Sequence, residues 1–295
     1  MAFMKSSFNQ LPGHARGALW MLFAAMFFSF HGPLVRMATV GTDPLMVAFV
    51  RSLFVFLMML PWIIRHYANE MKTNVLHLHA FRALFSMTGF VLLVVAQSKL
   101  TLAEVSALTF ASPLFATIGA VLFLREVVKA RRWIATFVGL AGVWIVLRPG
   151  LEVVDPYFIL PVGAAIFIAV SNLMIKSLSS HNSPNAIVAW LSIFSVPLTF
   201  VPALFVWSLP GVLGLGWAFL LGLSGVGAHM CLTRSLAAAD ASAVLPFDYA
   251  RLIFTASIAF IAFGEQPSIW TWVGGAIIVG AVVYIARRET IAGRS

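Results

Sequence analysis

Two charged side chains stand inside an apolar stretch of the chain. Residues 240–265 are long and apolar enough to cross a lipid bilayer, yet they contain Asp248 and Arg251 well inside their length. On a helix, residues three apart share one face, and Tyr249 lies beside them. A charge at that depth costs about 2.5–3.5 kcal/mol on insertion scales, so the pair predicts a binding or translocation site. The alternative interpretation is that the two charges neutralise each other and only hold helices together.

Two further ionisable residues stand in apolar stretches. The fork of the Arg51 guanidinium suits a carboxylate or phosphate group, although it could instead brace backbone carbonyls. His31 titrates in the physiological range, although a lone histidine in a membrane is often a hydrogen-bonded packing residue. We expect Arg251 to bind an anionic group of a substrate, and Asp248 or His31 to take up a proton.

Uncharged residues complete the predicted site. Aromatic rings stack on flat substrates, and amides and hydroxyls hydrogen-bond to neutral groups. The substrate-binding candidates, besides the two arginines, are Tyr249, Phe110, Trp190, Gln97, Asn172 and Ser112.

The residues needed for several other chemistries are missing from the sequence. The single cysteine, Cys231, excludes an intramolecular disulfide and a cysteine-based metal cluster. No His-Glu-x-x-His sequence occurs, essentially one acid lies within the apolar stretches, and there is no Walker A sequence. We therefore expect no enzyme, no cofactor and no metal site, and no ATP-driven transport by this chain alone.

Composition places the chain in a membrane. Of its 295 residues, 61% are hydrophobic and 10% are charged, and the mean hydropathy is +0.98. Soluble domains carry about 25% charged residues. The net charge of +9 suggests a nucleic-acid partner at first sight. In a membrane protein, however, such an excess reflects basic cytoplasmic loops, so we expect a lipid bilayer and no nucleic acid as partner.

Apolar segments of spanning length predict the architecture. A helix needs about 20 residues to cross about 30 Å of hydrocarbon. The expected spans are 16–36, 45–64, 79–98, 102–124, 132–148, 156–177, 184–207, 212–236, 240–263 and 268–287. The connections are too short for a separate catalytic domain.

Basic residues orient these spans. With the N-terminus in the cytoplasm, only Arg36, Lys99 and Arg148 fall on the outer side, and Arg51 and Arg251 fall inside spans. The other basic residues, Arg82 among them, fall on the cytoplasmic side, so both termini are expected to be cytoplasmic.

The two halves of the chain resemble each other. Thr42-Asp43-Pro44 aligns with Asn182-Ser183-Pro184, and 99–107 aligns with 235–243. Glu126 and Glu265 end equivalent helices, where each is expected to form a helix-end or gate salt bridge rather than to contact substrate. Five helices per repeat turn the second copy upside down, which is typical of secondary transporters with a site between the repeats. Repeat domains are expected at 1–150 and 151–295.

Three predicted helices contain sequences that break or loosen a helix. His31-Gly32-Pro33 interrupts the first, Ser112-Pro113 lies in the fourth, and Gly222, Gly225 and Gly227 lie in the eighth. Free backbone groups are tolerated in a membrane only beside protein or a water-filled cavity. We therefore interpret the three sites as hinges or ligand contacts.

Motifs in both halves resemble one transporter family. They are 107–115 with 123–126 and 139–143 in the first repeat, and 264–267 with 272–280 in the second. These resemble the ten-helix EamA branch of the drug/metabolite transporter superfamily. Residues 247–252, Phe-Asp-Tyr-Ala-Arg-Leu, look like a sub-branch that includes bacterial riboflavin and S-adenosylmethionine uptake proteins and a group of animal solute carriers.

The resemblance implies an all-α integral membrane protein of ten transmembrane helices, arranged as two inverted five-helix repeats. It implies a cavity between helices 1, 3, 4, 6, 8 and 9, with helices 5 and 10 at the periphery and available for a homodimer. The expected function is secondary transport of a small polar metabolite with an anionic or zwitterionic group, in a bacterial inner membrane. Proton coupling or exchange would drive it. The alternative is an exporter of amphipathic drugs, cations or amino acids.

Overall fold

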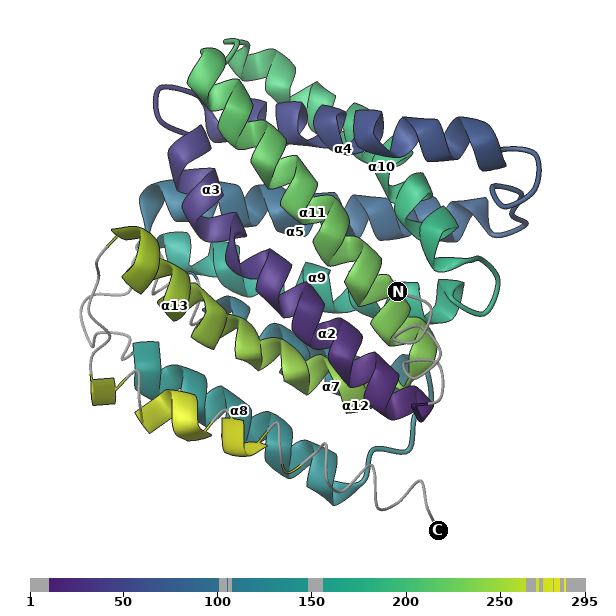
Figure 1. The fold of residues 1–295 in the computed structure, drawn as a ribbon, viewed down its shortest axis with the longest axis vertical. Helices are drawn as coiled ribbons and strands as arrows, with labels where there is room; N and C mark the ends of the chain where they lie inside the picture. The colour runs from purple at the N-terminus through teal and green to yellow at the C-terminus, as the bar shows by residue number, and fades with distance from the viewer. Residues whose placement is uncertain are drawn as a thin grey trace.

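The computed structural model describes residues 11–100, 105, 108–147, 156–263, 269–270, 273–277, 279–281 and 284. Every regular element within these ranges is a helix (Figure 1). The first repeat contains α2 (Gly13–Ser29), α3 (His31–Ala38), α4 (Pro44–His66), α5 (Leu76–Lys99), α7 (Ser112–Phe123) and α8 (Ala130–Leu147). The second contains η1 (Pro156–Phe158), α9 (Ile159–Leu178), α10 (Pro184–Ala203), η2 (Leu204–Val206), α11 (Val212–Ala238), α12 (Ala241–Val244), η3 (Leu245–Ala250) and α13 (Arg251–Phe263).

The expectation of an all-α membrane protein is confirmed. Within the described residues, six helices are long and apolar enough to cross a membrane. They are Gly13–Ala38, Pro44–His66, Leu76–Lys99, Ile159–Leu178, Pro184–Val206 and Val212–Ala238. Ser112–Phe123 and Trp133–Gly142 are shorter apolar helices.

Equivalent capping starts the second helix of each repeat. The Asp43 side chain accepts a hydrogen bond from Leu45 N at 2.8 Å, and proline follows at the first helical position of α4. The Ser183 hydroxyl does the same for Ala186 N at 3.3 Å at the start of α10, again followed by proline. Side-chain caps and an N1 proline both satisfy the free N–H groups of a helix start. The two short sequences that align between the halves therefore have the same structural role.

Helix packing follows the internal repeat. In Figure 1, α2 runs along α11, and the equivalent pair from the other repeat, α9 and α5, is also in extended contact. The equivalent helices α4 and α10 pack on each other, and α2 packs on η3 and α13 as α9 packs on α7. A two-fold relation between the repeats requires this pairing.

Three helices are broken, but they are not all the predicted ones. Phe30 ends α2 and begins α3, so the break before Gly32 is confirmed. A turn at 110–111 precedes Ser112 in the fourth helix. The expectation of a break in the eighth helix is wrong, because α11 is continuous from Val212 to Ala238. Its glycines instead allow neighbouring side chains to pack closely against the helix. A Cβ at Gly222 would lie 3.2 Å from Phe54 Cβ. The third break lies in the ninth helix, where η3 is 3₁₀.

The fifth helix lies at the edge of the bundle. Figure 1 places α8 on the side opposite α4, where it contacts η3 and α7. Gly139 of α8 faces this contact, since a Cβ there would lie 2.4 Å from Tyr249 Cδ2. Close packing therefore explains Gly139 within one chain. Parts of the tenth helix, together with Glu104, Glu265 and the expected boundary at 150–151, lie outside the described residues.

Candidate functional site

The Asp248–Arg251 pair forms an ion pair, but not on a regular α-helix. Nη2 of Arg251 lies 3.1 Å from Oδ2 of Asp248, with side chains 21% and 17% exposed. Asp248 belongs to η3, and Arg251 begins α13. In a 3₁₀ helix residues i and i+3 lie directly above one another, which explains the short contact. Both side chains are largely buried.

Aromatic rings surround Arg251. Its guanidinium carbon lies 4.8 Å from the Phe110 ring centroid and 5.8 Å from that of Phe28. Cations are attracted to the faces of aromatic rings at such distances. The Tyr249 ring lies 6.3 Å from Phe110 but points toward Gly139, and its buried hydroxyl has no hydrogen-bond partner in the described part of the chain.

Arg51 is a second buried cation. Its side chain is 3% exposed, and its guanidinium carbon lies 4.3 Å from the Phe90 ring centroid. Gly225 makes room for it, because a Cβ there would lie 2.5 Å from Nη2 of Arg51. Its Nε is buried without a partner, and no acid pairs with it among the described residues. A buried guanidinium without a counter-charge is costly unless a ligand supplies one.

His31 connects the two arginines. Its ring centroid lies 5.1 Å from that of Phe28 and 6.4 Å from that of Phe90. The break between α2 and α3 brings it there, and its Nε2 is buried without a partner in the described chain. A continuous run therefore leads from Arg51 through Phe90, His31 and Phe28 to Arg251. We call these five residues and Phe110 the central site.

The other predicted residues are less closely associated. Ser112 begins α7, two residues after Phe110, and is buried. Gln97 lies near the end of α5 with a buried, unpaired Oε1, and Asn172 is half-buried on α9. Trp190 packs in a different cluster, against residues of α4 and α11 such as Met59. Trp190 therefore lies in a cluster apart from the central site, and its packing does not support its predicted role in substrate binding.

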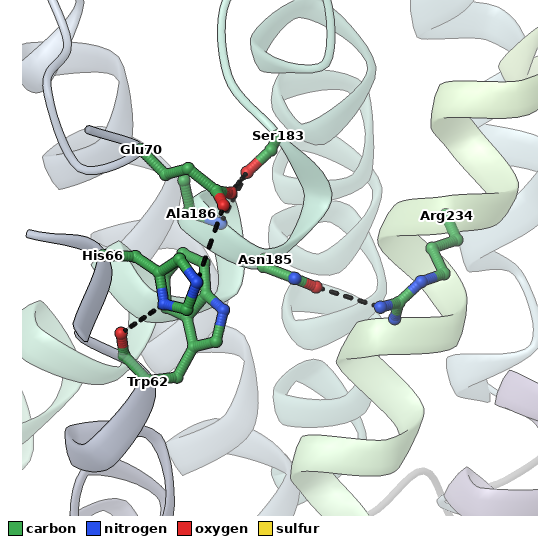
Figure 2. A network of polar contacts seen from close by, with 7 residues as sticks. All are labelled: Trp62, His66, Glu70, Ser183, Asn185, Ala186 and Arg234. Carbon is green, nitrogen blue, oxygen red and sulfur yellow. Dashed lines mark hydrogen bonds and ion pairs between the residues drawn. The ribbon is translucent and has the colours of Figure 1, made fainter. Parts of the chain in front are cut away.

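A polar network joins the two repeats at one end of the bundle (Figure 2). Ser183 donates a hydrogen bond to Oε2 of Glu70 at 2.7 Å, and His66 lies 4.0 Å from the same carboxylate. On a neighbouring helix, Arg234 donates to Oδ1 of Asn185 at 2.9 Å. The loops 67–75 and 179–183 lie at this end, which we call the loop end.

Glu126 contacts a helix end of the second repeat, and within the described residues it does so through hydrogen bonds rather than the expected salt bridge. Its carboxylate accepts hydrogen bonds from Ala241 N at 3.0 Å, Ser242 N at 3.2 Å and the Ser242 hydroxyl at 2.6 Å. It therefore caps α12 of the second repeat from the chain after α7 of the first. Arg125, at a left-handed φ of 55°, turns the chain immediately before it.

Comparison with known proteins agrees with this arrangement. The model of the EamA-like transporter family matches residues 15–148 and 156–287. The chain belongs to the EamA-like transporter family. It is therefore a multi-pass membrane transporter of small metabolites rather than an enzyme, and the duplicated repeat is confirmed.

Individual EamA relatives extend over nearly the whole chain. A riboflavin transporter of Vibrio cholerae is 35% identical over 93% of this chain and 94% of its own. An S-adenosylmethionine uptake transporter of Rickettsia bellii is 28% identical over 95% of this chain and 97% of its own. A solved crystal structure shares the fold with a TM-score of 0.78, at 16% identity, over 93% of this chain and 99% of that one.

Sequence reasoning missed several residues of this EamA bundle. Phe28 and Phe90 were not singled out, although Phe28 precedes His31 by three residues and so shares its face of the helix. Arg82 is counted with the cytoplasmic basic residues because it lies near the start of the expected span 79–98, but in the structure it is fully buried within α5. The spacing of polar residues along α5 would have indicated its position.

Proposed function

We propose that this EamA transporter takes up a metabolite with a flat heteroaromatic ring and an acceptor-rich polar group, and that riboflavin is the first candidate. The observation that supports it is the run of aromatic rings between two buried arginines in the central site. Rings stack on flat heterocycles, and guanidinium groups donate hydrogen bonds to carbonyl or carboxylate oxygens. The 35% identity to a riboflavin transporter supports the same choice.

S-adenosylmethionine is the second candidate. Arg51 has no acidic partner among the described residues, and a zwitterion would supply a carboxylate for it. The aromatic rings of the central site would stack on the adenine ring. This candidate retains the expectation of a zwitterionic substrate.

Alternating access between the two repeats is the proposed mechanism. Asp248 is the proposed proton acceptor when its pair with Arg251 opens, and His31 is the alternative. We place the protein in a bacterial inner membrane with both termini in the cytoplasm. For the expected homodimer, Gly275 has no atom within 4 Å of an added Cβ and so leaves room for a second copy, whereas Gly139 is occupied by Tyr249.

A ligand screen tests the substrate class. Purified protein in detergent is heated with riboflavin, S-adenosylmethionine, amino acids and cationic dyes, each in excess. A ligand at about 100 times its dissociation constant adds about 2.7 kcal/mol of stability, which shifts the melting temperature visibly. We expect riboflavin or S-adenosylmethionine to stabilise the protein, and Arg51→Gln to abolish the shift.

The exposed Arg36 provides the matched control. Arg36→Gln removes the same charge away from the central site and should leave the ligand shift unchanged. Stabilisation by cationic dyes alone, unaffected by Arg51→Gln or Arg251→Gln, would reject the proposal in favour of an exporter of amphipathic cations. Uptake of the stabilising ligand into proteoliposomes then tests transport itself.

A further inference from the structure

Mostly polar side chains form a stripe along α5 that extends beyond the central site. His79, Arg82, Ser86, Phe90 and Gln97 follow one another at spacings of three, four, four and seven residues. Such spacings keep residues on one side of a helix. All five are buried or half-buried, in a helix that otherwise consists largely of apolar residues. Since Phe90 belongs to the central site, the stripe connects that site to the loop end of the bundle.

Among the residues of the stripe, Arg82 has the most hydrogen-bond donors to satisfy. Its side chain is 0% exposed, and it donates one hydrogen bond, from Nη1 to the Ile187 carbonyl oxygen at 2.9 Å. Its Nε and Nη2 are buried without partners in the described part of the chain. A guanidinium has five N–H donors, so most of its hydrogen-bonding capacity is unused.

The neighbours of Arg82 also have unused polar atoms. His79, one turn away, donates a hydrogen bond from Nε2 to Oδ1 of Asn182 at 3.0 Å, so its Nδ1 is a buried acceptor without a partner in the described part of the chain. Trp190 of α10 lies 5.9 Å from the His79 ring, and its Nε1–H is buried and unpaired as well. Unpaired buried polar groups are rare, and three residues with them side by side indicate that something else binds there.

The local charge is also uncompensated. No acid within the described residues forms an ion pair with Arg82. Ile187, whose carbonyl it contacts, belongs to the first turn of α10, where the helix dipole is positive. A structural arginine would be expected near acids or at a helix C-terminus. The position of Arg82 instead attracts a group rich in hydrogen-bond acceptors.

We propose that Arg82, His79 and Trp190 form a second substrate site for the transported metabolite on its way between the central site and the loop end. Arg82 and Trp190 donate hydrogen bonds to an acceptor-rich or anionic group of the metabolite, and His79 Nδ1 accepts one from it. This inference rests on the proposed function for the identity of the metabolite, but not for the existence of the site. In the proposed orientation it is the cytoplasmic release site.

The structure shows this second site closed. Asn182, which contacts His79, also accepts a hydrogen bond from Thr73 at 3.0 Å, and Ser183 contacts Glu70 across the same two loops. These contacts cover the loop end of the stripe and join one repeat to the other. Opening of the loop end must therefore break them before Arg82 meets solvent.

The first experiment measures the charge of the path without using a substrate. In a Cys231→Ser background, Ser86→Cys places one thiol a turn from Arg82 on the same face. Inverted membrane vesicles are treated with an anionic sulfonatoethyl and a cationic trimethylammonium-ethyl methanethiosulfonate. We expect the thiol at position 86 to react faster with the anionic reagent than with the cationic one. Arg82→Gln should lower the ratio of the anionic to the cationic reaction rate about tenfold. Arg65→Gln removes an exposed charge near the same loops and should leave the ratio within twofold.

The second experiment measures half-saturation on each face of the membrane. Proteoliposomes are assayed by counterflow of labelled riboflavin, and separately of labelled S-adenosylmethionine. We expect Arg82→Gln to raise the half-saturating concentration at the loop-end face about tenfold, with a change of less than threefold at the opposite face. Arg82→Lys keeps the charge without the fork and should give an intermediate value.

The outcomes separate the two proposals. If the thiol at position 86 is not reached from the loop-end face, or Arg82→Gln leaves the rate ratio unchanged, the second site is rejected. Equal losses of affinity at both faces would also reject it and leave Arg82 as a brace for α10. If neither compound is transported but the rate ratio falls, the second site stands and the proposed substrate is wrong.

Discussion

At the scale of single residues, the EamA bundle keeps cations where the membrane interior disfavours them. Arg51 and Arg82 are buried without an acidic partner in the described chain, and Arg251 has one partner, Asp248. Aromatic faces compensate part of the cost for Arg51 and Arg251, since cation–π contacts contribute roughly 0.5–2 kcal/mol. The part of the burial cost that these contacts do not offset favours binding of a substrate rich in hydrogen-bond acceptors.

Substitution of Gly225 tests the position of Arg51. The methyl group of Gly225→Ala would lie 2.5 Å from Nη2 of Arg51 and force the guanidinium away from Phe90. We expect the affinity for the ligand found in the screen to fall about tenfold, or about 1.4 kcal/mol. Titration by tryptophan fluorescence or thermal shift measures it. Gly216→Ala, on the same helix with nothing within 4 Å, is the control, and equal effects of both would contradict the assignment.

Substitution of Asp248 tests the coupling. Asp248→Asn keeps the shape of the side chain but removes the group proposed to take up the proton. We expect exchange of labelled substrate across proteoliposomes to persist, while accumulation driven by an imposed pH gradient is lost. Both are measured on the same vesicles. If gradient-driven accumulation survives in Asp248→Asn and disappears in His31→Gln, the histidine is the proton acceptor.

At the scale of helices, breaks and caps decide how the repeats meet. The interruption between α2 and α3 brings His31 between two aromatic rings, and the 3₁₀ turn of η3 aligns Asp248 with Arg251. Glu126, just after α7 of the first repeat, contacts the start of α12 in the second.

A double-mutant cycle tests the cap on α12. Glu126→Ala removes the acceptor for two backbone N–H groups and the Ser242 hydroxyl. Losing such a cap costs about 0.5–2 kcal/mol, so we expect a lower melting temperature in detergent. Ser242→Ala alone should cost less. The double variant should be less destabilised than the sum, with a coupling of about 1 kcal/mol; additive effects would show that the side-chain contact contributes nothing.

Gly139 tests the packing of α8 on η3. A methyl group at this position would overlap the Tyr249 ring, 2.4 Å from Cδ2. Overpacking of this kind costs about 1–3 kcal/mol, so Gly139→Ala should unfold at a lower temperature. Gly275→Ala meets no atom within 4 Å and is the control for stability. If Gly275→Ala alone alters the oligomeric state in light scattering, the expected dimer uses the tenth helix.

At the scale of the whole molecule, the two repeats form one bundle whose helix pairs occur twice. Contacts between α2 and α11 are matched by those between α9 and α5, while α4 and α10 pair with each other. The Glu70–Ser183 and Glu126–Ser242 contacts both join one repeat to the other. Alternating access needs such contacts to form on one side while the other side opens.

Cysteine labelling tests the orientation of the whole bundle. Val40 and Tyr67 are 75% and 68% exposed in loops at opposite ends of α4. In a Cys231→Ser background we expect Val40→Cys to react with a membrane-impermeant maleimide in intact cells. Tyr67→Cys should react only after the cells are permeabilised. The reverse pattern would place both termini outside and contradict the orientation drawn from the basic residues.

The sequence by itself determined the class, the repeat and most of the charged candidates. Spanning lengths, basic residues and the aligned Thr-Asp-Pro and Asn-Ser-Pro sequences are local properties, and each depends on a few neighbouring residues. Arg51, Asp248 and Arg251 could be singled out because a charge in an apolar stretch is unusual wherever the chain folds.

Only the tertiary structure decided which of these residues act together. Phe28, Phe90 and His31 meet because α3, which begins at His31, packs on α5, and Trp190 lies apart from them in the cluster that includes Met59 of α4. Arg82 became a candidate site residue because its neighbours bury it and leave Nε and Nη2 without partners in the described part of the chain. Contacts between distant segments depend on packing across the whole bundle, which spacing along one segment does not specify.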